Sequence, residues 1–352
     1  DTKLITSLYD NVVRFKPSIQ KYKKVVHPLL KKQLKINQLE PWDKTVELSK
    51  TQHKYTIEQT KDIVLKALAP LGGEYISNVK KAFNEHWISW LSKPGKQQGA
   101  YSIGGTKGLN KYYISMNFDK SIGSISTIAH ELGHSMNSLY INKKQKVYAD
   151  VSIFYAEISS IVNETLLSYY LLDYYRNDLD MKKMILDELI NNFIATTTRQ
   201  IIFSATEYAL NNFVNAGKPF TKEVAKQTYE AMMEKYQGID ADLKIKMKKE
   251  PYTYLLSTIL RIPHFYVGNF YVYKYAVGQI VAVIVANKIF HGDKTMQQNY
   301  LKFLSSGNSL SPIDTIKLLG VDLFNSKTYS EAKSALDDWI NQLEKIKNKL
   351  IK

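Results

Sequence analysis

Five consecutive residues constrain this chain more than any other feature. His130, Glu131 and His134 spell the pattern His-Glu-x-x-His. In a helix, two histidines four positions apart lie on one face, about one turn above each other, where they can hold a single metal ion. Glu131 then lies beside that face and can act on a water molecule without being a ligand. Because so short a pattern can arise by chance, the surrounding sequence has to support it.

The residues around the motif have the period of an amphipathic helix. Between Lys120 and Tyr140, apolar side chains recur every three or four positions. They are Ile125, Ile128, Leu132, Met136 and Leu139. This stripe can pack on a core while both histidines, on the opposite side, face a cleft. Gly133 weakens a helix by about 1 kcal/mol relative to alanine, so we expect another backbone or a substrate to pass close to it.

A third metal ligand is expected in the next patterned segment. Catalytic zinc sites use about three protein ligands and a water molecule. Glu157 and Glu164 lie on one face of a predicted helix over residues 150–170, among apolar and small residues where an unpaired acid is costly to bury. We predict that Glu157 is the third ligand and that Glu164 orients a ligand histidine. Glu164 could instead be a structural acid paired with an Arg or Lys.

The stretches HELGHSM and FYAEISSIVNE together resemble the metal-binding core of the oligoendopeptidase F and thimet oligopeptidase family of zinc metallopeptidases. The resemblance implies one Zn²⁺ per chain, held by His130, His134 and Glu157, with Glu131 as the catalytic acid and base. The family commonly has a further histidine three positions after the second ligand, where this chain has Asn137. That departure concerns the support of the ligands and not the ligands themselves.

Two stretches before the motif resemble the strand that borders the active-site cleft in this family. They run from Gly99 to Ser102 and from Lys111 to Phe118. The resemblance implies that substrate binds along them, and we expect contacts at Gly99, Ala100, Tyr101 and Tyr113. Main-chain hydrogen bonds from a strand hold an extended peptide whatever its side chains are. An ordinary sheet edge would have the same sequence pattern and is compatible with this role.

Residues 260–278 resemble the family's His/Tyr-rich loop and helix, whose side chains face the zinc in relatives. When water attacks a peptide carbonyl, negative charge develops on the carbonyl oxygen, and donors placed there lower the barrier. We predict that His264 and Tyr271 are such donors, with Tyr273 and Tyr275 as competing candidates. Any one of these tyrosines could equally be a packing residue, since the chain has 25 of them.

Composition limits the class of protein. The absence of cysteine excludes disulfides, thiol catalysis and cysteine-ligated metals, and it fits the cytoplasm. The sequence has no apolar stretch long enough to span a membrane and no signal-peptide pattern at its N-terminus. The net charge of +15 could indicate nucleic-acid binding, but the 48 basic residues are spread along the chain among 33 acidic ones. We therefore expect no specific nucleic-acid partner.

The periodicity predicts a mainly α-helical protein with a small β-sheet bordering the active-site cleft, as in the zincin-like helical metallopeptidase domains that the resemblance implies. We expect residues 1–95 to continue from an absent N-terminal lobe and residues 96–352 to form the zinc-binding catalytic region, with metal helices at about 120–172. Further helices are expected at about 4–36, 56–68, 73–91, 181–215, 221–235 and 329–351, and a buried one at 275–290.

Together these features predict a zinc-dependent endopeptidase that acts on short unstructured oligopeptides. The missing lobe would be cleaved or supplied as a separate chain, and peptides would be the other partners. Two alternatives remain open. A metallocarboxypeptidase would have the same motif and a basic residue that binds the substrate carboxylate, and a peptide-binding protein would retain the fold without turnover.

Overall fold

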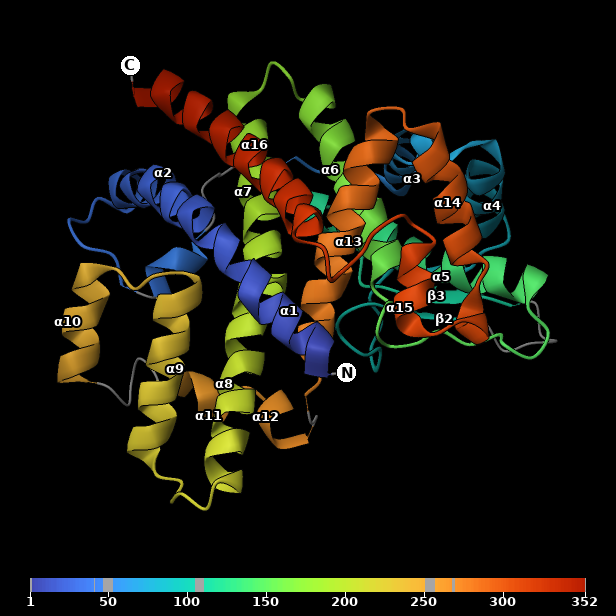
Figure 1. Cartoon of the computed structure of the whole chain (residues 1–352). Coiled ribbons are helices and arrows are strands. Elements are labelled where there is room, and N and C mark those ends of the chain that lie inside the picture. Colours follow the sequence, from blue (N-terminus) through green and yellow to red (C-terminus); the bar gives the residue numbers. More distant parts are fainter. Residues whose placement is uncertain are drawn as a thin grey trace. The chain divides into compact units, whose positions relative to one another are not determined.

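The computed structural model describes residues 2–40, 42–46, 53–104, 111–250, 257–267 and 270–351 (Figure 1). Within these ranges the chain is mostly helical and carries one small sheet, which confirms the predicted fold class. The chain divides into two compact units, each built from separate stretches. Unit 1 comprises Asp1–Lys44, Ile190–Val277 and Leu323–Lys347. Unit 2 comprises Thr45–Leu189, Gly278–Asp322 and Asn348–Lys352. The sequence-based division between residues 95 and 96 stays a prediction.

Unit 1 is helical throughout its described part. Its elements are α1 (Thr2–Val12), the 3-10 turn η1 (Val13–Phe15), α2 (Lys16–Leu34), α8 (Thr198–Asn215), α9 (Lys222–Tyr236), α10 (Ala241–Lys249), α11 (Ser257–Arg261) and α12 (His264–Val267). Three further helices carry residues of both units: α7 (Leu179–Thr196), α13 (Tyr273–Phe290) and α16 (Ser326–Ile351). Edge-to-face contacts of the Phe193 ring with Phe15 and Trp339, at 5.2 and 6.0 Å between centroids, fill the core of this unit.

Local signals correctly predict several helix ends. Pro17 lies in the first turn of α2, where the missing amide hydrogen costs nothing. Thr221 caps α9 by accepting a hydrogen bond from the Val224 amide, as its place before the helix predicts. The single long helix predicted for residues 181–215 is wrong, because α7 and α8 are separated at Thr197. There the backbone departs from helical dihedrals, with a φ of −99° and a ψ of −80°, and the threonine hydroxyl donates to the Phe193 carbonyl.

Unit 2 contains the sheet and the motif helix. Its elements are α3 (Ile57–Ala67), α4 (Gly73–Asn84), β1 (Ile88–Ser89), β2 (Tyr101–Ile103), β3 (Tyr113–Ser115), α5 (Ile122–Lys144), α6 (Ile158–Tyr174), α14 (Lys294–Leu304) and α15 (Pro312–Lys317), with the 3-10 turns η3 (Ala69–Leu71) and η5 (Gly307–Ser309). A further turn, η2 (Trp42–Thr45), lies at the boundary of the units. The helix predicted to run to residue 91 ends at Asn84, because His86 has a φ of 57°, which a right-handed helix does not allow.

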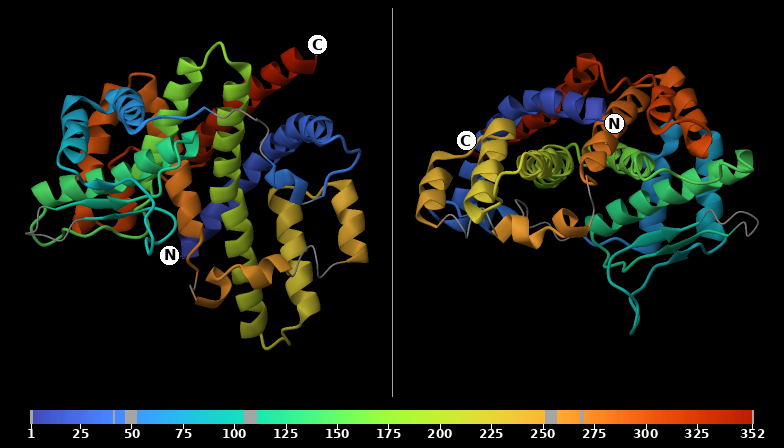
Figure 2. Two further views of the ribbon diagram at one scale, coloured as in Figure 1. Left: turned by 180° about the vertical axis from the view of Figure 1, so that it is seen from behind. Right: turned by 60° about the horizontal axis from the view of Figure 1, so that its bottom comes forward.

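The sheet has the order β1-β3-β2 and lies beside α5 (Figure 2). β1 pairs with β3 in parallel, with Ile88 opposite Ile114. β2 pairs with β3 in the antiparallel sense, with Ser102 also opposite Ile114. β2 is therefore an edge strand, and no other strand of the described chain pairs with its outer side. The segment 105–110 that joins β2 to β3 lies outside the described residues.

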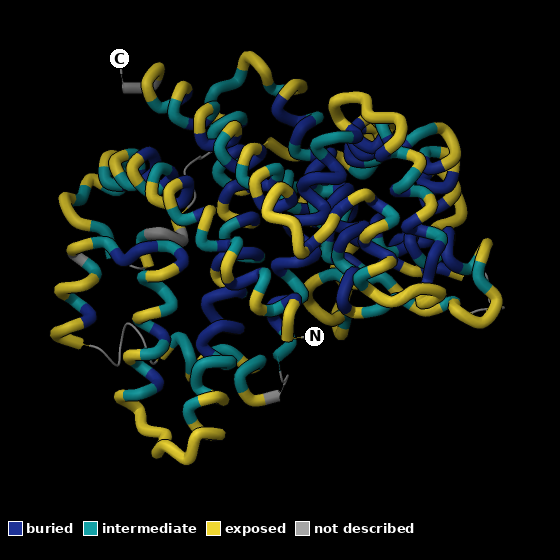
Figure 3. The backbone as a smooth tube through the Cα atoms, in the orientation of Figure 1, coloured by how far each residue is buried: buried dark blue, intermediate teal, exposed yellow. Residues whose placement is uncertain are grey.

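The core of unit 2 forms where α5 and α6 pack against each other (Figure 3). The predicted apolar stripe of α5 is buried: Ile125, Ile128, Leu132 and Met136 are each 0% exposed. The part of α13 in unit 2 is buried as well, which explains why it is apolar on every side. Among the described helices, none combines the length and apolarity that crossing a membrane requires.

Candidate metal centre

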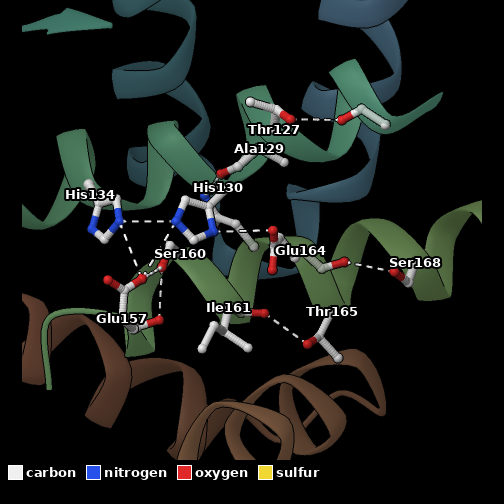
Figure 4. A network of polar contacts seen from close by, with 12 residues as sticks. Thr127, Ala129, His130, His134, Glu157, Ser160, Ile161, Glu164, Thr165 and Ser168 are labelled. Atoms are coloured by element: carbon white, nitrogen blue, oxygen red, sulfur yellow. Dashed lines mark hydrogen bonds and ion pairs between the residues drawn. The ribbon is translucent and has the colours of Figure 1, made fainter. Parts of the chain in front are cut away.

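α5 places both motif histidines on one partly exposed face. The helix begins after Ser121, whose hydroxyl accepts a hydrogen bond from the Ser124 amide, and the motif lies in its middle turns. His130 Nε2 and His134 Nε2 are 3.2 Å apart, and both rings point toward Glu157 (Figure 4). The buried stripe on the other side of the helix fixes this orientation, as the sequence pattern predicts.

Glu157 completes a triangle with the two histidines. Its Oε2 atom lies 3.5 Å from His130 Nε2 and 3.5 Å from His134 Nε2. The residue does not lie inside the helix predicted for residues 150–170. It is the N-cap residue of α6, which begins at Ile158, and it is the last residue of a turn over residues 153–157. Ser160 donates a hydrogen bond to the same oxygen at 3.1 Å and orients the carboxylate.

The three donor atoms have the spacing that a zinc ion requires. Ligand atoms about 2.0–2.2 Å from a tetrahedral zinc ion lie about 3.3–3.6 Å from one another. The observed separations are 3.2, 3.5 and 3.5 Å. Among the described residues, this is the only group of three or more His, Cys, Asp or Glu side chains that could hold a metal ion. Two imidazoles and one carboxylate form a donor set that suits zinc.

Glu164 contacts the far side of His130. Its Oε1 atom is 3.1 Å from His130 Nδ1. Glu164 lies seven residues after Glu157, about two turns along α6. A proton on Nδ1 donates to this carboxylate and leaves the Nε2 lone pair directed at the other donors. This geometry is the one expected of an acid that orients a ligand histidine, and the role itself stays a prediction.

Burial and opposite charges act against each other in this group. Burial alone would lower the pKa of His130, but Glu164 and then Glu157 raise it to about 8. Burial alone would raise the pKa of Glu157, but the contact with His134 and the nearby His130 lower it to about 2. Without metal, the site therefore favours a bound proton on a histidine beside a charged carboxylate. A metal cation would compete with that proton for the same nitrogen.

Glu131 lies in a different environment from the predicted ligands. It is 6% exposed. Burial raises its pKa, against the nearby His130 and His134, which lower it. A raised pKa makes this carboxylate a stronger proton acceptor than an exposed glutamate.

Two other predictions about α5 concern Gly133 and Asn137. A Cβ atom at Gly133 would lie 2.5 Å from the Ser159 carbonyl oxygen, so the expected close approach of another backbone is confirmed. Asn137 is buried, and its amide donates to the Leu304 carbonyl at 3.1 Å. The residue that replaces the expected histidine thus anchors α5 to the end of α14.

The predicted substrate strand is β2 with the residues before it. Ser102 and Ser135 share a hydrogen bond of 2.7 Å, which ties β2 to α5 beside His134. Tyr101 and Tyr113 are 43% and 52% exposed, on two paired strands. The Asn117 amide donates to the Gly99 carbonyl, and Ala100 follows it into the strand. Contacts of these residues with substrate stay a prediction.

The His/Tyr segment lies in unit 1, and three of its four candidate side chains form one group. The His264 ring stacks on Tyr271 at 5.5 Å and meets Tyr275 edge-on at 6.1 Å, while Tyr271 and Tyr275 are 5.4 Å apart. Tyr273 differs from them because it is buried, and burial raises its pKa. Gly268 and Asn269, within this segment, lie outside the described residues.

Sequence reasoning missed a residue that holds this segment. Glu207 of α8 accepts a hydrogen bond at 2.8 Å from the amide of Phe270, which has a φ of 48°. Burial raises the pKa of Glu207, and the nearby His264 lowers it. The available signal was a single acid in the apolar and small sequence IIFSATEYAL, the same signal that identified Glu157.

Comparison with known proteins shows the family of this chain. The model of the family described as Peptidase family M3 matches residues 1–335. The chain belongs to peptidase family M3. An oligoendopeptidase F homologue of Mycoplasma genitalium is 46% identical over 350 residues, covering 99% of this chain and 58% of that protein. Oligopeptidase PepF of Bacillus subtilis is 34% identical, over 96% of this chain and 49% of that protein.

Solved structures of peptidases have the same fold as this chain. A peptidase structure from Chlamydophila abortus, described as putative, matches with a TM-score of 0.84 at 30% identity, over 98% of this chain and 56% of that chain. Oligoendopeptidase F from Enterococcus faecium matches with a TM-score of 0.69 at 25% identity, over 99% and 53%. This M3 chain thus spans between about half and three fifths of the length of these relatives.

Proposed function

We propose that this M3 chain contains the catalytic site of a zinc-dependent endopeptidase that hydrolyses internal bonds of short, unstructured oligopeptides. The observation that carries the proposal is the triangle of His130, His134 and Glu157 beside the buried Glu131. Membership of a peptidase family and relatives named oligoendopeptidase support both the class of reaction and the class of substrate.

Bound zinc would supply a Lewis acid at the point where the three donor atoms converge. Glu131 takes a proton from the attacking water and delivers it to the leaving amine, as its raised pKa favours. Glu164 keeps His130 in the tautomer that directs Nε2 at the other donors. From the family resemblance alone, we further propose that His264, Tyr271 and Tyr275 supply hydrogen-bond donors for the carbonyl oxygen, on which negative charge develops.

The edge strand β2 is the proposed substrate-binding strand. A peptide that pairs with its outer side is held by main-chain hydrogen bonds, so many side chains are accepted. Gly99, Ala100 and Tyr101 offer the main chain, and Tyr113 extends the exposed surface. An extended peptide fits such an edge, whereas a folded substrate has few free main-chain groups to offer.

The deciding experiment compares the wild-type chain with Glu131→Gln. We expect the wild type to bind one Zn²⁺ and to cleave an internal bond of a quenched peptide of about ten residues with both ends blocked. The variant should bind Zn²⁺ equally well, while kcat falls by about 10²- to 10⁴-fold, because an amide cannot accept the proton. Glu58→Gln, an exposed acid on α3, is the matched control and should leave both unchanged.

Other outcomes would contradict specific parts of the proposal. Wild-type turnover by Glu131→Gln would remove Glu131 from proton transfer, and a wild type without metal affinity would refute the zinc site. Cleavage only of peptides with a free C-terminus, one terminal residue at a time, would show a carboxypeptidase. Zinc and peptide binding without hydrolysis would show a peptide-binding protein.

A further inference from the structure

α5 and α6 approach each other more closely than side chains normally permit. The Cβ position of Gly133 is 2.5 Å from both the Ser159 carbonyl oxygen and the Ser160 Cα atom. Both neighbouring atoms belong to the backbone of α6, so no flexible side chain could move aside for a larger residue. The absence of a side chain at residue 133 therefore sets the distance between the two helices.

A buried amide fixes how the two helices are aligned along their length. Asn163 is 0% exposed, and its Nδ2 donates to the Ala129 carbonyl at 3.0 Å. Its Oδ1 accepts from the Tyr75 hydroxyl at 2.9 Å, and Tyr75 is also fully buried. In a regular α-helix the Ala129 carbonyl also faces the amide of Gly133, four residues on. The glycine and the amide thus act on the same turn of α5.

Along the interface of α5 and α6, the contacts of Gly133 and Asn163 alternate with the contacts of the predicted metal group. Ala129 accepts a hydrogen bond from Asn163. The next residue on each helix makes the neighbouring contact, which is the one between His130 and Glu164. About one turn along α5, Gly133 faces Ser160, whose hydroxyl holds the Glu157 carboxylate. A slip of one turn would displace one helix by about 5.4 Å. A shift of about 1 Å would already take Glu157 away from the spacing that one zinc ion requires.

We propose that Gly133 and Asn163 are positioning residues of the metal centre. Gly133 sets the separation of α5 and α6, and Asn163 sets their register, so that Glu157 and Glu164 meet the two histidines. A hydrogen bond to a backbone carbonyl specifies one position on α5, which apolar packing alone does not. The inference rests on the proposed zinc site, and it assigns roles to two residues that would touch neither metal nor substrate.

Gly133→Ala tests the separation. A methyl group at residue 133 must push the backbone of α6 away, so we expect the Kd for Zn²⁺ to rise at least 10-fold, within the range of about 10- to 100-fold seen for residues that support ligands. Competition with a chromophoric chelator measures this Kd on the full chain. Gly123→Ala, in the first turn of the same helix, is the matched control, since its Cβ would meet only Ser121 Oγ at 3.5 Å. The Kd of the Gly123→Ala variant for Zn²⁺ should stay at the wild-type value.

Asn163→Leu and Tyr75→Phe together test the register. Tyr75→Phe removes one buried hydrogen bond and Asn163→Leu removes two, so both variants should lower the melting temperature of the metal-free protein. Only Asn163→Leu removes the bond to Ala129, so only this variant should raise the Kd for Zn²⁺. If it fails to fold, Asn163→Ser, which is polar but too short to reach Ala129, replaces it.

The outcomes separate this inference from the proposed function. If the wild type binds no Zn²⁺, the zinc site itself is wrong. If the wild type binds Zn²⁺ and both Gly133→Ala and the Asn163 variant keep its Kd within twofold, the positioning roles are wrong, whatever happens to their melting temperatures. An equal loss of affinity in Tyr75→Phe would show general destabilisation and would overturn the role of the Asn163–Ala129 bond.

Discussion

His130 is contacted at both ring nitrogens, each time by a carboxylate. Glu164 lies 3.1 Å from Nδ1, and Glu157 lies 3.5 Å from Nε2. The contact with Glu164 favours the His130 tautomer that has its proton on Nδ1. The contact with Glu157 lies where a metal ion would bind. Glu131, next to His130 in sequence, lies beside this group without being part of the triangle, as its place in the motif predicts. We therefore predict separate chemical roles for these two neighbouring residues, because their side chains leave the helix in different directions.

The aromatic residues of the His/Tyr segment differ in the same way. Tyr271 and Tyr275 contact His264, whereas Tyr273 is buried. We predict that Tyr271→Phe and Tyr275→Phe each lower kcat by about 10²-fold, because each removes a donor to the developing oxyanion. Tyr273→Phe should change kcat less than threefold. Steady-state kinetics with the blocked peptide measure these values, and a loss in Tyr273→Phe as large as in the other two would contradict the assignment.

At the scale of elements, a network of hydroxyl and carboxylate groups defines the start of α5. Asp119 accepts hydrogen bonds from the Ser121 amide and hydroxyl and from the Ser124 hydroxyl. These bonds lower the pKa of Asp119 to about 2, Ser121 first and then Ser124. Negative charge before the first turn also favours the exposed amides of a helix N-terminus. The ligand helix therefore begins at a residue set by local chemistry.

This network predicts a pH-dependent effect of Asp119→Asn. In the folded state, the pKa of the Asp119 carboxyl lies below its ordinary value of about 4. Its stabilising contribution is therefore complete above about pH 4 and is lost as pH falls toward about 2. The variant should unfold at lower urea than the wild type at pH 7, and this difference should shrink between pH 4 and pH 2. Asp62→Asn, which removes an exposed pair with Lys66, is the control and should change little at any pH. An Asp119→Asn effect that is equal at pH 7 and pH 2 would contradict the argument.

At the scale of the whole molecule, the proposed metal ligands all belong to unit 2, although the chain passes between the two units several times. His130 and His134 come from α5, and Glu157 comes from the cap of α6. A metal ion held by both helices binds only the folded state. Its binding free energy is therefore added to the stability of the folded protein.

We predict that metal removal with a chelator lowers the melting temperature and that added Zn²⁺ restores it. At free Zn²⁺ of about 1,000 times Kd, the stabilisation is about 4 kcal/mol. Hydrogen exchange should slow in α5 and α6 when Zn²⁺ binds, and should change less in α8 and α9 of unit 1. His134→Ala is the control, since it should abolish the Zn²⁺ effect. Equal changes in all four helices would contradict the assignment of the site to unit 2.

Much of what depends on residues close together in the chain could be predicted from the sequence. The spacing of His130 and His134, the buried stripe of α5 and the cap at Thr221 are set within one or two helical turns. The break at Thr197 was missed although it is local, because a threonine that bonds back to its own helix has no distinctive pattern. The end of α4 before His86 was missed because few residues other than glycine adopt a positive φ, and the presence of a histidine does not by itself mark such a position.

The sequence alone thus determined the class of fold, the two motif histidines and the acids expected to join them, since these follow from helical periodicity and residue chemistry. Only the tertiary structure decided that Glu157 lies just before α6 and 3.5 Å from both histidines, that Asn163 reaches the Ala129 carbonyl and that Tyr273 is buried. These facts depend on contacts between residues far apart in the chain. Such contacts depend on how the helices pack. The close packing of α5 and α6 requires a residue without a Cβ atom at position 133.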